Sequence, residues 1–327
     1  AFWQCDFKTN SATGGSGGRG GDGQVPSYPG GLGGNAGDAL GGAVHNQGQL
    51  SFYECNLDYN SATGGRGGDG GTGSTGSAAY GGEGGTGGKG WGGAIYNLGG
   101  LMMTDCSITS GATTGGDGGD GGSGFVVGRG GSGDQGAGGA IYNLGFTTNL
   151  NSVFIGNASQ SGDSKHGGIN NGQTYEIDGR NGVSSFGGAV CDLGTNIAVN
   201  CTFYGNIVVG SDAGHSLAGW SAGVGGNGGS GWGGNLYSAG RTMITNCTVA
   251  AGGAQGGSKG TGFSPSQDGA NGSSRGGNVA KNGGVFILHN TILYYPSIGT
   301  NGYTGSGAFT DGGFCISSDR SVTLNGF

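Results

Sequence analysis

The eight-residue motif GGAIYNLG occurs at residues 92–99 and again at residues 138–145, each time after a glycine-rich segment. Alignment on the second glycine of the GG pair yields seven copies, at Gly42, Gly93, Gly139, Gly188, Gly234, Gly277 and Gly313. Self-similarity at a period of about 20 to 50 residues is the signature of repeat architectures, whose units bury a core only by stacking on one another. The repeat therefore predicts a solenoid.

Like residues recur at fixed distances from that glycine. Two residues on lies an apolar column, made of Val44, Ile95, Ile141, Val190, Leu236, Val279 and Cys315. Four residues on lies a polar column, made of Asn46, Asn97, Asn143, Asp192, Ser238, Lys281 and Ser317. Thirteen residues on, or fourteen in the sixth copy, lies a column of small residues, made of Cys55, Cys106, Ser152, Cys201, Cys247 and Thr291, with Cys5 in the same role at the start. The alternation of apolar and polar residues around these columns is typical of strands.

The segment between the glycine and the small residue keeps its length, whereas the segment that follows varies between 22 and 38 residues. A slip of one residue would turn inward side chains outward, so a segment of fixed length indicates strands stacked in register. We therefore predict an all-β parallel β-helix of about seven coils, with coils about 4.8 Å apart. It forms a single solenoid domain over residues 1–327, with repeats starting near residues 1, 51, 102, 148, 197, 243 and 287.

The variable segments carry a triplet rule of their own. Stretches such as GGSGGRGGDG from Gly14 and GGRGGDGGTG from Gly64 place a side chain at every third residue. Three residues per turn is the repeat of the polyproline II helix, and glycine at two of three positions lets such helices pack backbone to backbone. Each coil is thus predicted to carry a glycine-rich arm of polyproline II helices that runs out and back. The alternative is a flexible glycine linker.

The frame resembles a known family. The pairs GGAI with FIGN (residues 154–157) and GGAV with FYGN (residues 203–206) resemble the GGA-plus-aliphatic and FxxN motifs of the polymorphic outer-membrane proteins, and NCTFYGN looks like bacterial surface proteins with right-handed parallel β-helix repeats. The arms resemble those of glycine-rich antifreeze proteins. This resemblance implies a right-handed coil, export, and adhesion or surface display, and it supplies no catalytic residues.

Composition narrows the function classes. The net charge is −7 and charged residues make up 9%, so the chain lacks the basic footprint of a nucleic-acid-binding protein. No apolar run approaches the length of a membrane-spanning helix. The start AFWQCDF fits a mature or trimmed chain, and we expect an extracellular or cell-surface location.

Two sets of residues are candidate sites. Free thiols that fill a narrow inward slot explain the cysteine column, although disulfides between adjacent coils are sterically allowed. Cys191 and Cys315 fall in other columns and have no evident partner. The motif GGxGxD, which ends at Asp22, Asp69 and Asp120, makes these residues calcium candidates. The alternative is that Asp22 and Asp69 pair with Arg19 and Arg66, three residues earlier.

Catalysis is not expected. A polysaccharide lyase or hydrolase needs convergent carboxylates with a base or acid, and the acidic residues here are scattered through the arms. An ice-binding protein would need a regular threonine array, which the sequence lacks. His45 falls in the column of Tyr96, Tyr142 and Tyr237, and the tyrosines of this column are expected to face outward. We predict no cofactor.

The two ends of the chain suggest self-association. No capping segment is evident, and residues 324–327 repeat the strand with which the chain begins. Head-to-tail stacking through Phe2, Trp3, Leu324, Asn325 and Phe327 would extend the solenoid into a filament. The sequence therefore favours an extracellular structural subunit of a self-assembling fibre. The alternative is a passenger or adhesin fragment of a larger bacterial surface protein that binds a host or glycan ligand.

Overall fold

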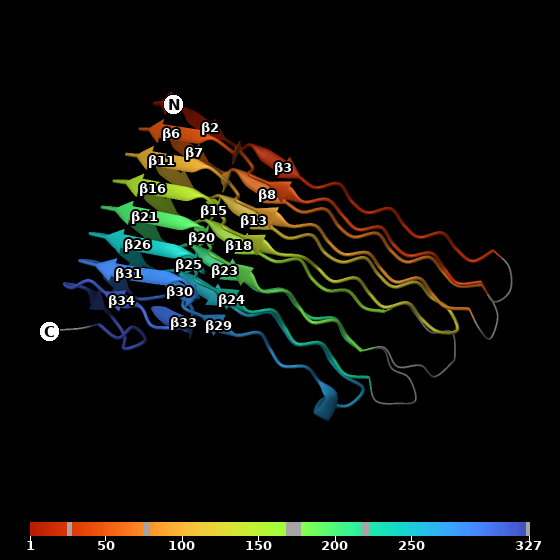
Figure 1. Ribbon diagram of the computed structural model, residues 1–327. Helices are drawn as coiled ribbons and strands as arrows, with labels where there is room; N and C mark the ends of the chain where they lie inside the picture. The colour runs from red at the N-terminus through yellow and green to blue at the C-terminus, as the bar shows by residue number, and fades with distance from the viewer. Residues whose placement is uncertain (25–27, 75–78, 168–177, 217–222, 325–327) are drawn as a thin grey trace.

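The computed structural model describes residues 1–24, 28–74, 79–167, 178–216 and 223–324. The chain is all-β, with long stacks of parallel strands in the arrangement of a parallel β-solenoid (Figure 1). Extended segments project from one side of the stack and lie one above another (Figure 1). The parallel strand stacking predicted from the repeat is therefore correct.

Five sheets run along the stack, and we number them I to V in chain order. Sheet I contains β1 (Phe2–Trp3), β6 (Gln49–Tyr53), β11 (Gly100–Thr104), β16 (Phe146–Leu150), β21 (Thr195–Val199), β26 (Arg241–Thr245), β31 (Val285–His289) and β34 (Thr310–Asp311). Sheet II contains β2 (Asp6–Lys8), β7 (Asn56–Asp58), β12 (Ser107–Thr109), β17 (Val153–Ile155), β22 (Thr202–Tyr204), β27 (Thr248–Ala250), β32 (Ile292–Tyr294) and β35 (Ile316–Ser317).

Sheets III and IV flank the projecting segments, and sheet V follows sheet IV in each coil. Sheet III contains β3 (Ser11–Thr13), β8 (Ser61–Thr63), β13 (Ala112–Thr114), β18 (Ala158–Gln160), β23 (Ile207–Val209) and β28 (Gly253–Gln255). Sheet IV contains β4 (Ala39–Leu40), β9 (Gly90–Trp91), β14 (Gly136–Ala137), β19 (Ser185–Phe186), β24 (Gly231–Trp232) and β29 (Ser274–Arg275). Sheet V contains β5 (Val44–Asn46), β10 (Ile95–Asn97), β15 (Ile141–Asn143), β20 (Val190–Asp192), β25 (Leu236–Ser238), β30 (Val279–Asn282) and β33 (Gly302–Ser306). A short 3-10 helix, η1 (Pro265–Gln267), lies in the last projecting segment.

The two copies of GGAIYNLG stack directly on each other. In sheet V, Ile95 pairs with Ile141 and Asn97 pairs with Asn143. His45 pairs with Tyr96, as the column alignment predicted. The register repeats from coil to coil because a one-residue slip would take the aliphatic residues out of the core.

Corners between sheets are formed by residues with positive φ. Between sheets I and II the corner column is Gln4, Glu54, Asp105, Asn151, Asn200, Asn246 and Asn290, with φ of 45° to 56°. Asn and Asp tolerate this left-handed conformation better than other residues with a side chain, which explains why this column is polar. In the first six copies of the repeat, the first glycine of the GG pair forms another corner, as at Gly92 and Gly138, with φ of 67° and 65°.

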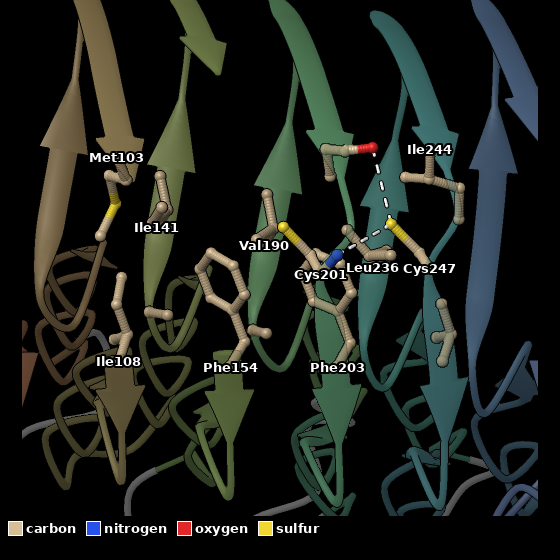
Figure 2. Packing of buried hydrophobic residues seen from close by; sticks show 14 of the residues in the cluster. Met103, Ile108, Ile141, Phe154, Val190, Cys201, Phe203, Leu236, Ile244 and Cys247 are labelled. Atoms are coloured by element: carbon tan, nitrogen blue, oxygen red, sulfur yellow. Dashed lines mark hydrogen bonds between the residues drawn. The ribbon is translucent and has the colours of Figure 1, made fainter. Parts of the chain in front are cut away.

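The main core is a column of buried apolar side chains that runs the length of the stack. Figure 2 shows Ile141, Val190 and Leu236 from sheet V facing Phe154 and Phe203 from sheet II. The rings of Phe154 and Phe203 stack with their centroids 4.7 Å apart and 9° between their planes. Each coil thus buries its apolar side chains against those of its neighbours, as expected for a solenoid.

The tyrosine column is buried, contrary to the prediction that it faces outward. Tyr96 and Tyr142 point away from the main core but are only 6% and 5% exposed. The ring of Trp91, on β9, stacks on Tyr142 at 4.6 Å and 4° and covers it. A second core, made mainly of aromatic side chains, therefore fills the angle between sheets IV and V, where the projecting segments return to the solenoid.

The last repeat has a different alignment from the one predicted. Val279 pairs with Gly302 rather than with a residue near Gly313, because the final coil has no glycine-rich segment. Ile292 pairs with Ile316, which places Cys315 next to Thr291 in the column of small residues and Ser317 in sheet II. The predicted positions of Cys315 and Ser317 in sheet V are therefore wrong, and Gly313, from which the match of residues 324–327 to the first strand was counted, is not a glycine of the repeated frame.

The C-terminal end of the core is closed, contrary to the expectation of an uncapped solenoid. Val322 is 4% exposed, and Phe309 and Leu324 pack against the main core. Backbone N–H groups of Asn301 and Gly302 donate to Asp319 Oδ2 and Ser321 Oγ, each over 2.8 Å. Residues 309–324 thus act as a cap. Asn325 and Phe327 lie outside the described residues.

Candidate interaction surface

Each projecting segment, with its outgoing and returning halves, forms one layer, and the layers are counted from the N-terminus. Each layer hydrogen-bonds to the layers next to it. In the first layer, the N–H of Gly17 donates to the carbonyl of Arg66 over 2.9 Å, and that of Gly20 donates to the carbonyl of Asp69 over 2.8 Å. The donors recur at every third residue and the acceptors do the same in the second layer. The triplet phase of the sequence is thus the phase of the hydrogen bonds between layers.

The outgoing and returning halves of one layer also hydrogen-bond to each other. The N–H of Gly34, on the return, donates to the carbonyl of Gly18 over 2.8 Å, and the N–H of Gly68 in the next layer donates to Gly34 over 2.8 Å. A Cβ at Gly68 would lie 2.1 Å from the carbonyl oxygen of Gly18, well inside van der Waals contact. Glycine is required at this position because another backbone occupies the space of a side chain.

Side chains at the third position of the triplet continue the same ladder. Asp22 Oδ1 accepts the N–H of Thr72 over 2.7 Å, and Asp69 Oδ1 accepts the N–H of Asp120 over 2.9 Å. This role was not predicted, although the recurrence of Asp and Asn at the third position of the triplet is a signal for it. Each such side chain accepts a backbone N–H group of the next layer that the glycine backbones do not pair.

The calcium candidates take part in ion pairs with arginine. Arg19 contacts Asp22 at 2.6 Å and Arg66 contacts Asp69 at 2.7 Å, as the alternative interpretation predicted. Arg66 also contacts Asp120 at 3.0 Å. The hydrogen bond from Arg19 holds the pKa of Asp22 below its usual value. Within the described ranges, no three His, Cys, Asp or Glu residues gather into a metal-binding group.

The cysteine column lies in the main core. Cys55, Cys106, Cys201 and Cys247 are buried, Cys5 is half-buried at the open end, and all are free thiols. The N–H of Cys201 donates to Cys247 Sγ over 3.4 Å (Figure 2). Burial raises the pKa of Cys106. These thiols therefore behave as small apolar side chains. Cys191 lies instead in the second aromatic core, where burial raises its pKa well above its usual value.

The polar column of sheet V forms a buried hydrogen-bond ladder. Asn46 Nδ2 donates to Asn97 Oδ1 over 2.7 Å, Asn97 to Asn143 over 2.8 Å, and Asn143 to Asp192 Oδ1 over 2.7 Å. Asp192 is fully buried and also accepts from Thr242 Oγ1 over 2.8 Å. Burial raises the pKa of its carboxyl group above the usual value, while these hydrogen bonds lower it.

A second asparagine ladder was not foreseen as a unit. Asn157 Nδ2 donates to Asn206 Oδ1 over 2.8 Å, Asn206 to Asn235 over 2.6 Å, and Asn235 to Asn278 over 2.8 Å. Asn157 and Asn206 end FxxN motifs, whereas Asn235 and Asn278 follow the GG pair. The ladder thus passes from one column of the sequence to another, which an alignment by columns cannot reveal.

The N-terminal end of the stack is open. Strands β1 to β5 are all edge strands, one in each sheet. Phe2 and Trp3 are 39% and 62% exposed, and Trp3 stacks on Tyr53 at 4.0 Å. Exposed edges of this kind are templates for pairing with another chain. The open end is therefore the candidate interaction surface.

Comparison of the chain with protein-family models, with curated proteins and with solved structures finds no match. The resemblance to the polymorphic outer-membrane proteins therefore stays a prediction. No helix in the described part of the chain is long and apolar enough to cross a membrane.

Proposed function

We propose that the protein is an extracellular structural subunit that self-assembles into a fibre, with the N-terminal end of one copy against the C-terminal end of another. In this proposal the coils are right-handed, and the projecting segments are ordered polyproline II arms that form a sheath beside the solenoid. The resemblance of the frame motifs to exported surface proteins supports the extracellular location.

The open N-terminal end is the observation that carries this proposal. Five parallel strand edges and the half-buried side chains of Phe7, Val44 and Leu50 lie at one end of the stack, while the main core at the other end is covered by residues 309–324. A soluble β-protein normally blunts its edges with charge, proline or a covering element. A contact between two different ends of the molecule generates an open filament, unless the rotation from one copy to the next closes the copies into a ring.

The hydrogen bonding of the arms supports their role as a rigid sheath. Bonds at every third residue, as from Gly14, Gly17 and Gly20 to the next layer, match the three residues per turn of polyproline II. A flexible linker would not hold this phase. Hydrogen exchange on the glycine runs tests this part of the proposal, since unprotected arm amides in the folded protein would refute it.

Electron microscopy and analytical ultracentrifugation of the purified chain test the fibre itself. We expect filaments whose length grows with protein concentration. Monodisperse short rods at all concentrations would overturn the proposal and favour the adhesin alternative, for which binding to a panel of glycans is the next measurement.

A further inference from the structure

Two of the four histidines lie next to each other in the arms. His166 is in the outgoing half of the fourth layer, and His215 is at the equivalent position of the fifth layer. Their rings stack with the centroids 4.8 Å apart and 28° between the ring planes. In the same column the second and third layers carry Asp69 and Asp120. Histidine thus takes a position that carboxylates hold in the earlier layers.

Both imidazoles accept backbone hydrogen bonds from the next layer. The N–H of His215 donates to His166 Nδ1 over 3.1 Å. The N–H of Thr261, in the sixth layer, donates to His215 Nδ1 over 2.8 Å. A ring nitrogen that accepts an N–H cannot itself carry a proton, so both rings are neutral, with their proton on Nε2. The contact between these layers therefore requires the neutral form of each histidine.

The returning halves of the same three layers contain a matched ladder without histidine. Asn181 Oδ1, in the fourth layer, accepts the N–H of Asn227 in the fifth over 2.8 Å. Asn227 Oδ1 accepts the N–H of Ala270 in the sixth, also over 2.8 Å. A side-chain amide does not titrate near neutral pH, whereas the ordinary pKa of an imidazole is about 6.5. The outgoing column therefore depends on pH and the returning column does not.

The groups around His166 favour its neutral form. Burial lowers the pKa of His166, and the charges of His215 and Lys165 lower it further. Asp120 of the third layer raises this pKa, but its carboxylate also contacts Arg66 at 3.0 Å. If both rings were protonated, two positive charges would lie in one stack with a centroid distance of 4.8 Å.

The sixth layer supplies the charged groups near His215. Asp268 interacts electrostatically with His215 and also forms an ion pair with Lys259 at 2.9 Å. The direction of the pH dependence follows from His166, whose pKa is lowered in the folded state. The stability that its neutral ring contributes is fully present above the unfolded pKa of about 6.5, and it is lost as the pH falls through the folded value.

We propose that His166 and His215 form a pH-sensitive switch that holds the outgoing halves of the fourth, fifth and sixth layers together at neutral pH and loosens them in acid. When a ring takes up a proton from solvent, Nδ1 becomes a donor and faces the N–H of the next layer without a lone pair to accept it. Two backbone donors then lose their acceptors. This inference does not rest on the proposed self-assembly, because it concerns contacts within one chain.

Hydrogen exchange followed by NMR tests the switch at single amides. We expect the protection factors of the His215 and Thr261 amides to fall at least tenfold between about pH 7.5 and about pH 5, a range that spans the ordinary pKa of an imidazole. The amides of Asn227 and Ala270 in the same layers are the internal control and should keep their protection. The chemical shifts of the two rings report their protonation in the same samples.

The double variant His166→Asn with His215→Asn separates the titration from the packing. Asparagine is the acceptor that the returning halves use, so the variant should stay protected at both pH values. Equal protection of His215 and Thr261 at both pH values in the wild type would overturn the inference, as would rings that stay neutral at about pH 5. An equal loss of protection in the variant would also overturn it. If the variant does not fold, the wild-type comparison with Asn227 and Ala270 decides alone.

Discussion

Replacing one rung of the buried asparagine ladder should destabilise the whole stack. Asn157 is fully buried, and its Oδ1 accepts the N–H of Gly111 over 2.8 Å. Its Nδ2 donates to the carbonyl of Ile108 over 3.1 Å and to Asn206 Oδ1 over 2.8 Å. The side chain therefore joins three successive coils, and Asn157→Ala removes all three bonds at once.

The size of the effect follows from the partners left behind. The N–H of Gly111 has no other acceptor among the described residues, and an orphaned buried donor costs about 1–3 kcal/mol. Each of the two lost amide donations contributes about 1 kcal/mol. We expect Asn157→Ala to lower the free energy of unfolding by about 3–5 kcal/mol. Asn10→Ala, at the exposed end of the FxxN column, removes one bond to Asn60 and should lower it by about 0.5–1 kcal/mol.

Equilibrium unfolding in urea, followed by circular dichroism, measures both variants. Equal m-values would show that each variant loses the same surface on unfolding as the wild type, so that the midpoints report stability. A loss below 1 kcal/mol for Asn157→Ala, equal to that of Asn10→Ala, would refute the reasoning, because water or a shifted backbone would then satisfy the Gly111 donor.

Three further predictions concern the arms, the main core and the buried hydrogen-bond ladder of sheet V. Gly68→Ala should expose its layer to hydrogen exchange and cost about 1–3 kcal/mol, because the new Cβ would lie 2.1 Å from the Gly18 carbonyl oxygen; normal protection would contradict the packing of the layers. Phe203→Ala should lower the free energy of unfolding by about 3–5 kcal/mol, since Phe203 is fully buried, whereas Tyr204→Ala, at a side chain 53% exposed, should change it by less than about 1 kcal/mol. Asp192→Asn should raise the melting temperature at pH 7. Burial raises the folded-state pKa of Asp192, so its contribution to stability is fully present below the unfolded pKa and is lost as pH rises through the folded value. The advantage of the variant should vanish near pH 3, and an equal advantage at both pH values would count against a charged Asp192.

Much of the frame was predictable because strand pairing between coils copies sequence spacing. Ile95 pairs with Ile141 and Asn97 with Asn143 since both copies carry the same number of residues between corners. The prediction failed at Cys315, where the last coil lacks an arm and the GG pair at residues 312–313 is not the frame pair. A local motif cannot indicate its own register when the segment before it has changed length.

The candidate surface was predicted less well. The sequence pointed to Phe2, Trp3 and the C-terminal residues, but Leu324 packs on the core as part of a cap. Capping depends on where the chain lies after its last strand, and no periodicity encodes that path. The sequence did not distinguish the open Gly18 from the covered Gly68 either, because each is the second glycine of a GG pair that precedes a charged residue.

The sequence by itself determined the repeat, the strand alternation and the triplet phase of the arms, since these follow from spacing and from the absence of side chains. The tertiary structure alone decided which polar columns form ladders, that Tyr142 is buried beneath Trp91, and which glycine layers are covered. Those outcomes depend on contacts between coils that are about 45 to 50 residues apart. Such contacts exist only once the layers have stacked.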